Sequence, residues 1–259
     1  MPSAPSRFLL AAVAVVSLAT PRRIWAQDPF EIQVYEYETV PRGRWDLETH
    51  VNYTARGIRE LDAGVAPSER QTHLTFELTR GITKYFELAG YLVTARRQRA
   101  DPEIAGWRLR PRFRLPEDWL PFKFSLSTEF GFPKRIYEEN AVTFELRPIL
   151  ERSFGRLQID LNPVLGKAIR GPTASGFWDF EPGARFGYTA NKTVDLSVEY
   201  YGATGSLTHV APAAQQMHQI FPGADINFSP DVVLNVGVGF GLTSAGNTLV
   251  YKTRLGWIF

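Results

Sequence analysis

The last thirteen residues, 247–259, alternate between apolar and polar side chains and end on an aromatic residue at the C-terminus. Lys252, Arg254 and Gly256 share one face, and the opposite face carries Leu249, Tyr251, Thr253, Leu255, Trp257 and Phe259. A repeat of two residues predicts a β-strand with one apolar side. A soluble protein rarely ends on such a strand.

This final strand resembles the signal that bacterial outer-membrane barrels present to their assembly machinery. The residues that carry the resemblance are Tyr251, Leu255, Trp257 and Phe259. The resemblance implies the barrel-assembly machinery as a partner. It also predicts that the other strands have one face toward lipid and one toward a polar interior.

The N-terminus is typical of a secretory signal peptide. Arg7 precedes a twelve-residue apolar run, 8–19, which is too short to cross a membrane. We expect residues 1–26 to be removed, with a cut after Ala19 as the alternative to Ala26. The domain prediction is then a signal peptide at 1–26, a periplasmic N-terminal segment of strand-like sequence at 27–41, and a barrel at 42–259.

Composition excludes several other classes of protein. The chain has no cysteine, so an exported protein of this kind holds together without disulfides. No apolar run of about 18 residues follows the signal, which excludes a transmembrane helix but not a barrel. The net charge of +2 argues against a nucleic-acid partner. Frequent glycine and proline and the absence of long 3.6-residue periodicity favour an all-β fold.

Twelve segments from residue 43 onward have the length and alternation of strands. The links between successive segments differ in length according to whether their number along the chain is even or odd. The even-numbered links are short, at 81–84, 116–121, 154–156, 190–192 and 229–231. The odd-numbered links are mostly longer, at 54–71, 96–106, 133–140, 167–176, 202–216 and 243–246. Outer-membrane barrels have short periplasmic turns, longer outer loops and an even strand count. We therefore predict an antiparallel up-and-down transmembrane barrel of twelve strands in the bacterial outer membrane, with both termini periplasmic.

Aromatic residues gather near both ends of the predicted strands, as barrel girdles require. A soluble β-sandwich is the alternative, because half-buried strands also alternate. Several prolines fall at outward positions of the strands, where a missing ladder donor predicts bends. They are Pro111, Pro148, Pro163, Pro182 and Pro222.

The inward faces of the predicted strands hold most of the charge. The fourth strand places Arg108, Arg110, Arg112 and Arg114 at every second position, about 7 Å apart. Such close guanidinium groups repel one another unless carboxylates intervene. Glu87 and Glu129 on the neighbouring strands are the expected partners, with Glu145 further round. The eleventh strand instead directs Gly237, Gly239 and Gly241 inward. We predict a lumen that is crowded and basic on one wall and open on the other, lined also by Lys123 and Arg147.

Two functions fit such a lumen. The arginines either belong to a salt-bridge network that fills a closed barrel, or form a channel wall that attracts anionic or polar groups. The glycine strip favours the channel, because a barrel plugged by its own side chains gains stability by filling that volume. The closed alternative is a barrel that binds a partner or surface ligand through its outer loops. Arginines and lysines of those loops can meet lipopolysaccharide phosphates, although exposed loop charge explains them better.

Catalytic and metal-binding interpretations find little support. A lipid-modifying enzyme needs a serine beside an outward histidine, and His218 has no serine two positions along its strand. The inward pairs Glu48 with His50 and His73 with Glu77 have metal-ligand chemistry, but polar lumen residues explain them more simply. No phosphate-binding loop is present. We therefore expect no enzymatic activity, no cofactor and no metal.

The opening of the barrel sequence adds a family resemblance. Residues 31–35, Gly43, Leu47, Glu48 and 50–53 are similar to the opening of outer-membrane proteins regarded as transporters linked to phenol-degradation pathways. The resemblance covers only the first strand and the residues before it, and it implies a barrel that passes small molecules, with aromatic ones as one option. The function expected from the sequence is thus a channel or transporter for small polar or aromatic solutes. Its expected surroundings are outer-membrane lipid and lipopolysaccharide.

Overall fold

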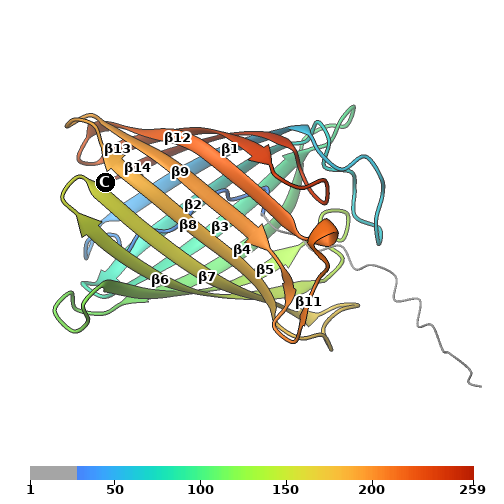
Figure 1. The fold of residues 1–259 in the computed structure, drawn as a ribbon, viewed down its shortest axis with the longest axis horizontal. Helices are drawn as coiled ribbons and strands as arrows, with labels where there is room; N and C mark the ends of the chain where they lie inside the picture. The colour runs from blue at the N-terminus through green and yellow to red at the C-terminus, as the bar shows by residue number, and fades with distance from the viewer. Residues whose placement is uncertain (1–27) are drawn as a thin grey trace, which may run out of the picture.

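The computed structural model describes residues 28–259, so the predicted signal peptide and Gln27 lie outside the described residues. Twelve long strands follow one another along the chain (Figure 1). They are β1 (Trp45–Arg56), β2 (Thr72–Thr83), β3 (Phe86–Arg96), β4 (Glu103–Arg114), β5 (Lys123–Pro133), β6 (Val142–Phe154), β7 (Leu157–Arg170), β8 (Asp179–Thr189), β9 (Val194–Ala203), β12 (Met217–Ser229), β13 (Val232–Gly241) and β14 (Leu249–Ile258).

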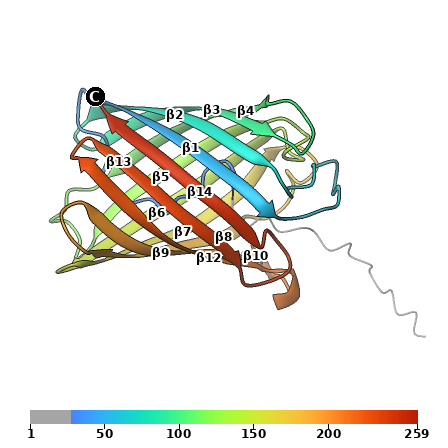
Figure 2. The same ribbon diagram turned by 90° about the horizontal axis from the view of Figure 1, so that it is seen from above.

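These strands form one closed antiparallel sheet. Each pairs with its neighbours in the chain, and the first, β1, pairs with the last, β14, so that the sheet has no free edge (Figure 2). Closure leaves no open edge on the twelve-stranded sheet, as a hydrocarbon surrounding demands. The prediction of an all-β, twelve-stranded, up-and-down barrel is confirmed.

One link carries small elements of its own. Between β9 and β12 lie the two-residue strands β10 (Gly205–Ser206) and β11 (His209–Val210) and the 3₁₀ turn η1 (Ala213–Gln215). No helix among the described residues is long and apolar enough to span a membrane.

Side chains alternate between the two faces of the sheet as the sequence predicts. On β4, Leu109 and Phe113 are exposed on the outside, whereas Arg110 and Arg112 are buried inside. The same division holds on β2, where Phe76 and Leu78 face out and Glu77 is buried between them. An apolar exterior around a polar interior is the reverse of a sandwich with a dry core. The outer surface is therefore suited to hydrocarbon.

The two ends of the barrel differ as the link lengths predict. The links after β2, β6, β8 and β12 have two to four residues, whereas the link after β4 has eight (115–122); we call their side the short-turn end and the opposite side the long-loop end. The C-terminus lies at the short-turn end (Figure 1). The outward prolines interrupt the sheet without displacing it. The pairing of β4 with β5 breaks between Leu109 and Arg112 and resumes in the same register around Pro111.

Candidate functional site

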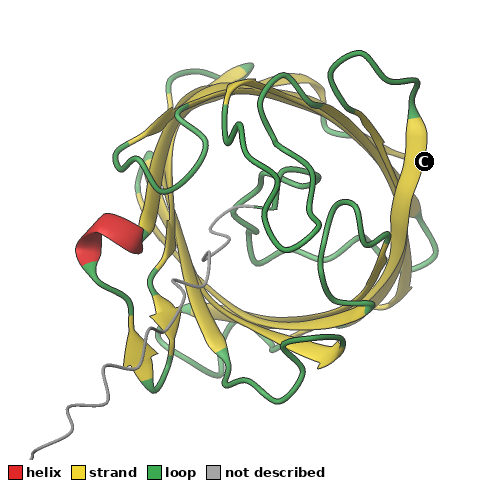
Figure 3. Ribbon diagram, turned by 90° about the vertical axis from the view of Figure 1, so that its right-hand side faces the viewer, coloured by secondary structure: helices red, strands yellow, loops and turns green. Residues whose placement is uncertain are grey.

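Residues 28–41, which we call the lumen segment, lie inside the barrel. The carbonyl of Pro29 accepts a hydrogen bond from the Asn52 side chain toward the long-loop end of β1, and Pro41 lies against Gly81 near the short-turn end. The view along the barrel axis shows chain inside the ring of strands (Figure 3). The described part of this segment is thus a lumen insert, which differs from the periplasmic segment expected at 27–41.

The described ends of the chain consequently lie at opposite ends of the barrel. Asp28 is near the long-loop end, whereas Phe259 is at the short-turn end. The expectation that both termini face the periplasm stays a prediction, because residues 1–27 lie outside the described residues. The side of the membrane that each barrel end faces stays a prediction.

Apolar side chains of the lumen segment explain its position. Phe30 packs edge-on against His73 and Tyr137, with ring centroids 4.6 Å and 5.8 Å away. Further along, Ile32 and Val34 join a buried cluster with Tyr201, Phe221 and Val250. Burial of these side chains holds the segment in an otherwise polar interior.

The lumen segment forms no strand, and side chains of the barrel strands make the hydrogen bonds that its backbone groups need. The Asn162 side chain accepts from the Tyr35 N–H at 2.7 Å and donates to the Tyr35 carbonyl at 3.0 Å. Glu151 accepts from the Tyr37 N–H at 2.9 Å, and Glu87 accepts from the Val40 N–H at 2.6 Å. Side chains of three strands therefore replace the ladder that this backbone lacks.

The arginines of β4 form what we call the arginine wall: Arg108, Arg110, Arg112 and Arg114. Carboxylates separate them as the spacing predicts. The Glu87 carboxylate lies 2.9 Å from Arg110 and 3.6 Å from Arg112. The Glu129 carboxylate lies 3.1 Å from Arg108. The two expected partners are therefore brought to the wall.

Other contacts of the arginine wall come from outside the neighbouring strands. Arg110 also donates to Glu77 on β2, and Arg112 donates to the carbonyls of Glu36 and Glu38 on the lumen segment. Arg108 pairs with Asp28, and Arg114 pairs with Glu38. The lumen segment thus contacts all four arginines, three of them through these bonds and Arg110 through the Tyr35 ring.

Tyr35 lies at the centre of this arrangement. Guanidinium groups of three arginines approach its ring, at 4.2 Å for Arg147, 5.0 Å for Arg110 and 5.4 Å for Arg112. Its hydroxyl donates to Glu31 and lies 3.0 Å from the Tyr91 hydroxyl. An aromatic ring among guanidinium groups is favoured by cation–π attraction.

The opposite wall is not the open space expected. We call Gly237, Gly239 and Gly241 of β13 the glycine wall. A Cβ atom on Gly239 would lie 2.2 Å from the Phe221 ring, and one on Gly237 would lie 3.0 Å from Lys252. Phe221 is fully buried. Side chains from the neighbouring strands therefore occupy the volume that the glycines leave.

The remaining predicted lining residues have local partners. Lys123 lies 3.0 Å from Glu151 on the neighbouring strand. Glu145, expected further round the wall, pairs instead with Arg147 on its own strand at 2.7 Å. The assembly-signal residues Tyr251, Leu255, Trp257 and Phe259 are all exposed on the outer surface.

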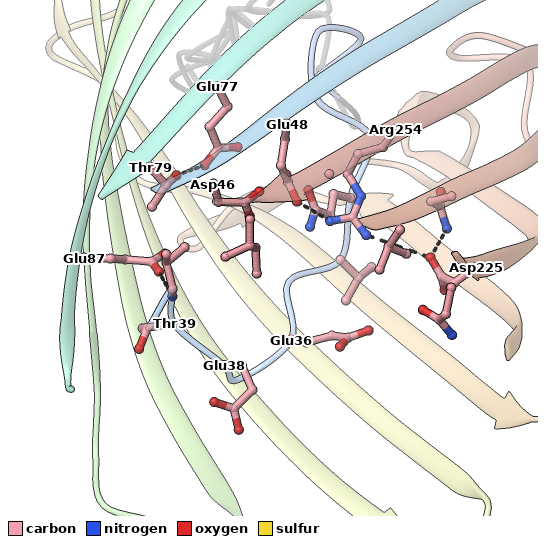
Figure 4. A pocket seen from close by; sticks show the side chains of 18 of the residues that line it. Glu36, Glu38, Thr39, Asp46, Glu48, Glu77, Thr79, Glu87, Asp225 and Arg254 are labelled. Carbon is pink, nitrogen blue, oxygen red and sulfur yellow. Dashed lines mark hydrogen bonds and ion pairs between the residues drawn. The ribbon is translucent and has the colours of Figure 1, made fainter. Parts of the chain in front are cut away.

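A cavity of about 310 Å³ remains at the short-turn end. The lumen segment forms one side of it, and the strands β1, β2, β12, β13 and β14 form much of the rest (Figure 4). Ten carboxylates and five basic side chains line it. Glu36 and Glu38, on the segment, are about half exposed there. The space left in the lumen is therefore acidic, in contrast to the basic wall expected from β4.

Sequence reasoning missed three contributors to this site. Glu77 faces inward as predicted, but the sequence does not show that Arg110 reaches past β3 to it. Phe221 is an inward aromatic residue on a face that also holds Gln219 and Asp225, a signal that a lumen cluster exists. The lumen segment has Phe30, Ile32 and Val34 at alternate positions without a place in the lipid-facing sheet, which is a signal of burial inside.

Solved structures resemble this fold, although the sequences are distant. No protein-family model matches the chain, and no curated protein matches it. An outer membrane channel from Pseudomonas putida F1 superposes with a TM-score of 0.57 at 13% identity, over 88% of this chain and 100% of that one. The KdgM porin superposes with a TM-score of 0.54 at 10% identity, over 83% of this chain and 99% of that one. The same porin in complex with disordered oligogalacturonate superposes with a TM-score of 0.50 at 11% identity, over 83% of this chain and 99% of that one. The chain has the fold of a bacterial outer-membrane barrel.

Proposed function

We propose that this chain is an outer-membrane channel for small polar or aromatic solutes, and that the lumen segment closes it. One observation carries the proposal. The segment fills the lumen but contributes no strand to the sheet, whose ring is complete without it. Its departure breaks no ladder hydrogen bond, so the barrel keeps its form when the segment moves. The wall left behind is polar, as a water-filled pore requires.

The chemistry around Tyr35 supports an aromatic solute. A phenol ring already lies among three guanidinium groups, and its hydroxyl lies 3.0 Å from that of Tyr91 on the wall. A solute ring can take that place when the segment leaves, because arginine stacks on any aromatic face. The resemblance of residues 31–53 to transporters linked to phenol-degradation pathways points to the same class of solute. Fold alone assigns no function, and this inference rests on the site.

A reversible cross-link tests whether the segment closes the channel. A Cβ atom on Gly183 of β8 would lie 3.5 Å from a Val34 methyl group, which is within a small adjustment of disulfide geometry. The natural chain has no cysteine, so the double variant Val34→Cys with Gly183→Cys has only the introduced pair. In planar bilayers we expect the reduced protein to open as the wild type does and the oxidised protein to stay closed. Each single variant is the control. Equal currents from oxidised and reduced protein would contradict gating by the segment.

The filled lumen also favours a second function, a closed barrel that binds a partner through its long loops. In that case the ion pairs and the lumen segment are a permanent core. Conductance separates the two: absence of current at any voltage, from wild-type and reduced variant alike, supports the closed barrel. Current through the reduced protein excludes it.

A lipid-modifying activity is the least supported function. Both ring nitrogens of His218 have partners, the Tyr200 hydroxyl at 2.7 Å and the Gln216 side-chain oxygen at 3.0 Å. Neither partner is a nucleophilic serine. Loss of a measured lipid hydrolysis in His218→Gln would revive this function.

The surroundings of the barrel follow from the same proposal. Its apolar belt fits outer-membrane lipid, and exposed arginines such as Arg99 and Arg135 fit lipopolysaccharide phosphates. The exposed final strand fits the barrel-assembly machinery. Shortening the chain by Phe259 and comparing the rate of assembly in vesicles with and without that machinery tests the last of these.

A further inference from the structure

Three potential ligand residues meet deep inside the barrel, on three different parts of the chain. Glu31 comes from the lumen segment, His50 from β1 and Glu77 from β2, and their ligand atoms all lie within 4.8 Å of one another. All three residues are buried, each with 3% or less of its surface exposed. Glu48, two residues before His50 on the same face of β1, adds a third carboxylate. This group of four is called the inner cluster below.

The imidazole of His50 points to a ligand. Its side chain is 1% exposed, and its Nε2 atom has no hydrogen-bond partner. The nearest acceptors to Nε2 are carboxylate oxygens, Glu48 Oε2 at 3.4 Å and Glu77 Oε2 at 3.8 Å. A buried nitrogen that lies near carboxylate oxygens but makes no hydrogen bond to them is the pattern that a bound cation would complete.

His73, the neighbouring histidine on β2, shows the contrast. It is equally buried and its Nδ1 atom likewise has no hydrogen-bond partner, but its Nε2 atom lies 2.9 Å from the Gln71 side-chain oxygen and its ring packs against Phe30. Its ring is therefore held by an amide and an aromatic group. Of the two histidine–glutamate pairs that stand out in the sequence, only the one with His50 has ligand geometry.

The carboxylates are oriented by contacts on their other oxygen. Glu48 Oε1 accepts from Arg254 at 2.5 Å, which leaves Oε2 directed at His50. Glu77 Oε1 accepts from Arg110 and from the Thr79 hydroxyl at 2.9 Å, and its Oε2 likewise faces the imidazole. Outer partners of this kind fix ligand orientation in metal sites.

We propose that the inner cluster binds one divalent transition-metal ion of the zinc class. Such ions accept imidazole nitrogen together with carboxylate oxygen. Bonds of about 2.0–2.2 Å place tetrahedral ligand atoms about 3.3–3.6 Å apart. The separations of 3.4 Å and 3.8 Å at Nε2 are close to this value, and flexible glutamates close the rest. The cation also offsets the cost of gathering buried carboxylates.

The ion has a route to the site. Glu48 and Glu77 line both the inner cluster and the acidic cavity at the short-turn end. A cation attracted by that cavity therefore meets two of the four residues of the inner cluster directly. Because Glu31 belongs to the lumen segment, a bound ion would tie the segment to β1 and β2. This consequence rests on the proposed gating function, whereas metal binding itself does not.

Metal binding is tested on the full-length protein without a histidine tag. Equilibrium dialysis should find one bound Zn²⁺ ion per chain. Co²⁺ bound in its place should show the visible absorption bands that are typical of Co²⁺ with a low coordination number. His50→Gln should weaken Zn²⁺ binding by more than about 100-fold, beyond the effect of losing an outer partner. The matched control, His73→Gln, should bind as the wild type does. Absence of Zn²⁺ from the folded wild type, or equal losses in both histidine variants, would overturn the site.

A second variant guards against misfolding. Glu31→Gln changes a residue outside the sheet, so the barrel should form, which heat-modified migration in gels verifies. It should weaken Zn²⁺ binding at least about 10-fold; unchanged binding would remove Glu31 from the site. In bilayers, chelation should raise the open fraction of wild-type channels and leave Glu31→Gln unaffected. Binding without any effect of chelation on current would keep the metal site and exclude its role as a clamp.

Discussion

The arginine wall and the glycine wall lie far apart around the barrel, and they were predictable to different degrees. For the arginine wall, Glu87 and Glu129 on adjacent strands are the partners that alternation predicts. For the glycine wall, alternation predicts empty space, but Phe221 and Lys252 fill it. The difference teaches that a strand pattern gives the direction of a side chain and its lateral neighbours. It does not reveal what reaches across a curved lumen.

The largest effect should come from opening the arginine wall at its centre. Arg110→Met leaves the buried carboxylates Glu77 and Glu87 without their shared cation. Removing one partner of a buried ion pair costs about 3–5 kcal/mol. Urea titration of folding in lipid vesicles measures the loss. Arg135→Met, at an exposed loop position, is the control and should change stability little. Equal effects would mean that the wall is not a paired network.

The next test concerns the opposite face of the same strand. Leu109 lies between Arg108 and Arg110 in sequence but is exposed on the lipid side. Leu109→Arg should cost about 2–4 kcal/mol, because it places a charge in the middle of the hydrocarbon. Phe113→Arg, near the strand end, should cost only about 0–1 kcal/mol. The same vesicle titration compares them, and equal costs would argue against an apolar belt centred on Leu109.

The glycine wall makes a smaller but sharper prediction. Gly239→Val forces a side chain into the Phe221 ring and should destabilise the barrel by about 1–3 kcal/mol through overpacking. Together with Phe221→Ala, it should cost less than the sum of the two single losses. Gly90→Val is the control, because Gly90 faces outward with open space beside it. If the two losses simply add in the double variant, Phe221 does not fill the space at Gly239.

The smallest effect belongs to the exposed margin of the arginine wall. Glu38 pairs with Arg114 and Lys123, but its side chain is 58% exposed. Glu38→Gln should change stability by only about 0–1 kcal/mol, because water screens such pairs. High salt should remove the difference from the wild type. A loss of stability comparable to that of Arg110→Met would show that exposed and buried ion pairs of this wall contribute equally.

Most of the fold was predictable because each strand carries its own signal. Lipid requires an apolar residue at every second position, so Leu109 and Phe113 identify their face without knowledge of any other strand. The length of each link likewise predicted, without knowledge of the other links, at which end of the barrel it lies. The boundaries shifted by a few residues, as at Thr83, where β2 ends later than the sequence predicts.

The candidate site was predictable only in part, for a physical reason. Glu87 lies on the adjacent strand from Arg110, so register places it, whereas Glu77 lies one strand further and depends on the length of the arginine side chain. Tyr35 has no sheet register at all. Its position follows from the burial of its apolar neighbours and from the two hydrogen bonds between its backbone and the Asn162 side chain. No local sequence pattern reveals either contact.

The most direct test is whether the lumen segment lies against β8 in the assembled barrel. Cysteines introduced together by Val34→Cys and Gly183→Cys should cross-link almost completely when the folded protein in vesicles is oxidised. The pair made by Val34→Cys and Gly90→Cys, with the second on the lipid face, should not. If both cysteines of the first pair remain free and react readily with a bulky maleimide, the segment lies outside the lumen and the account is contradicted.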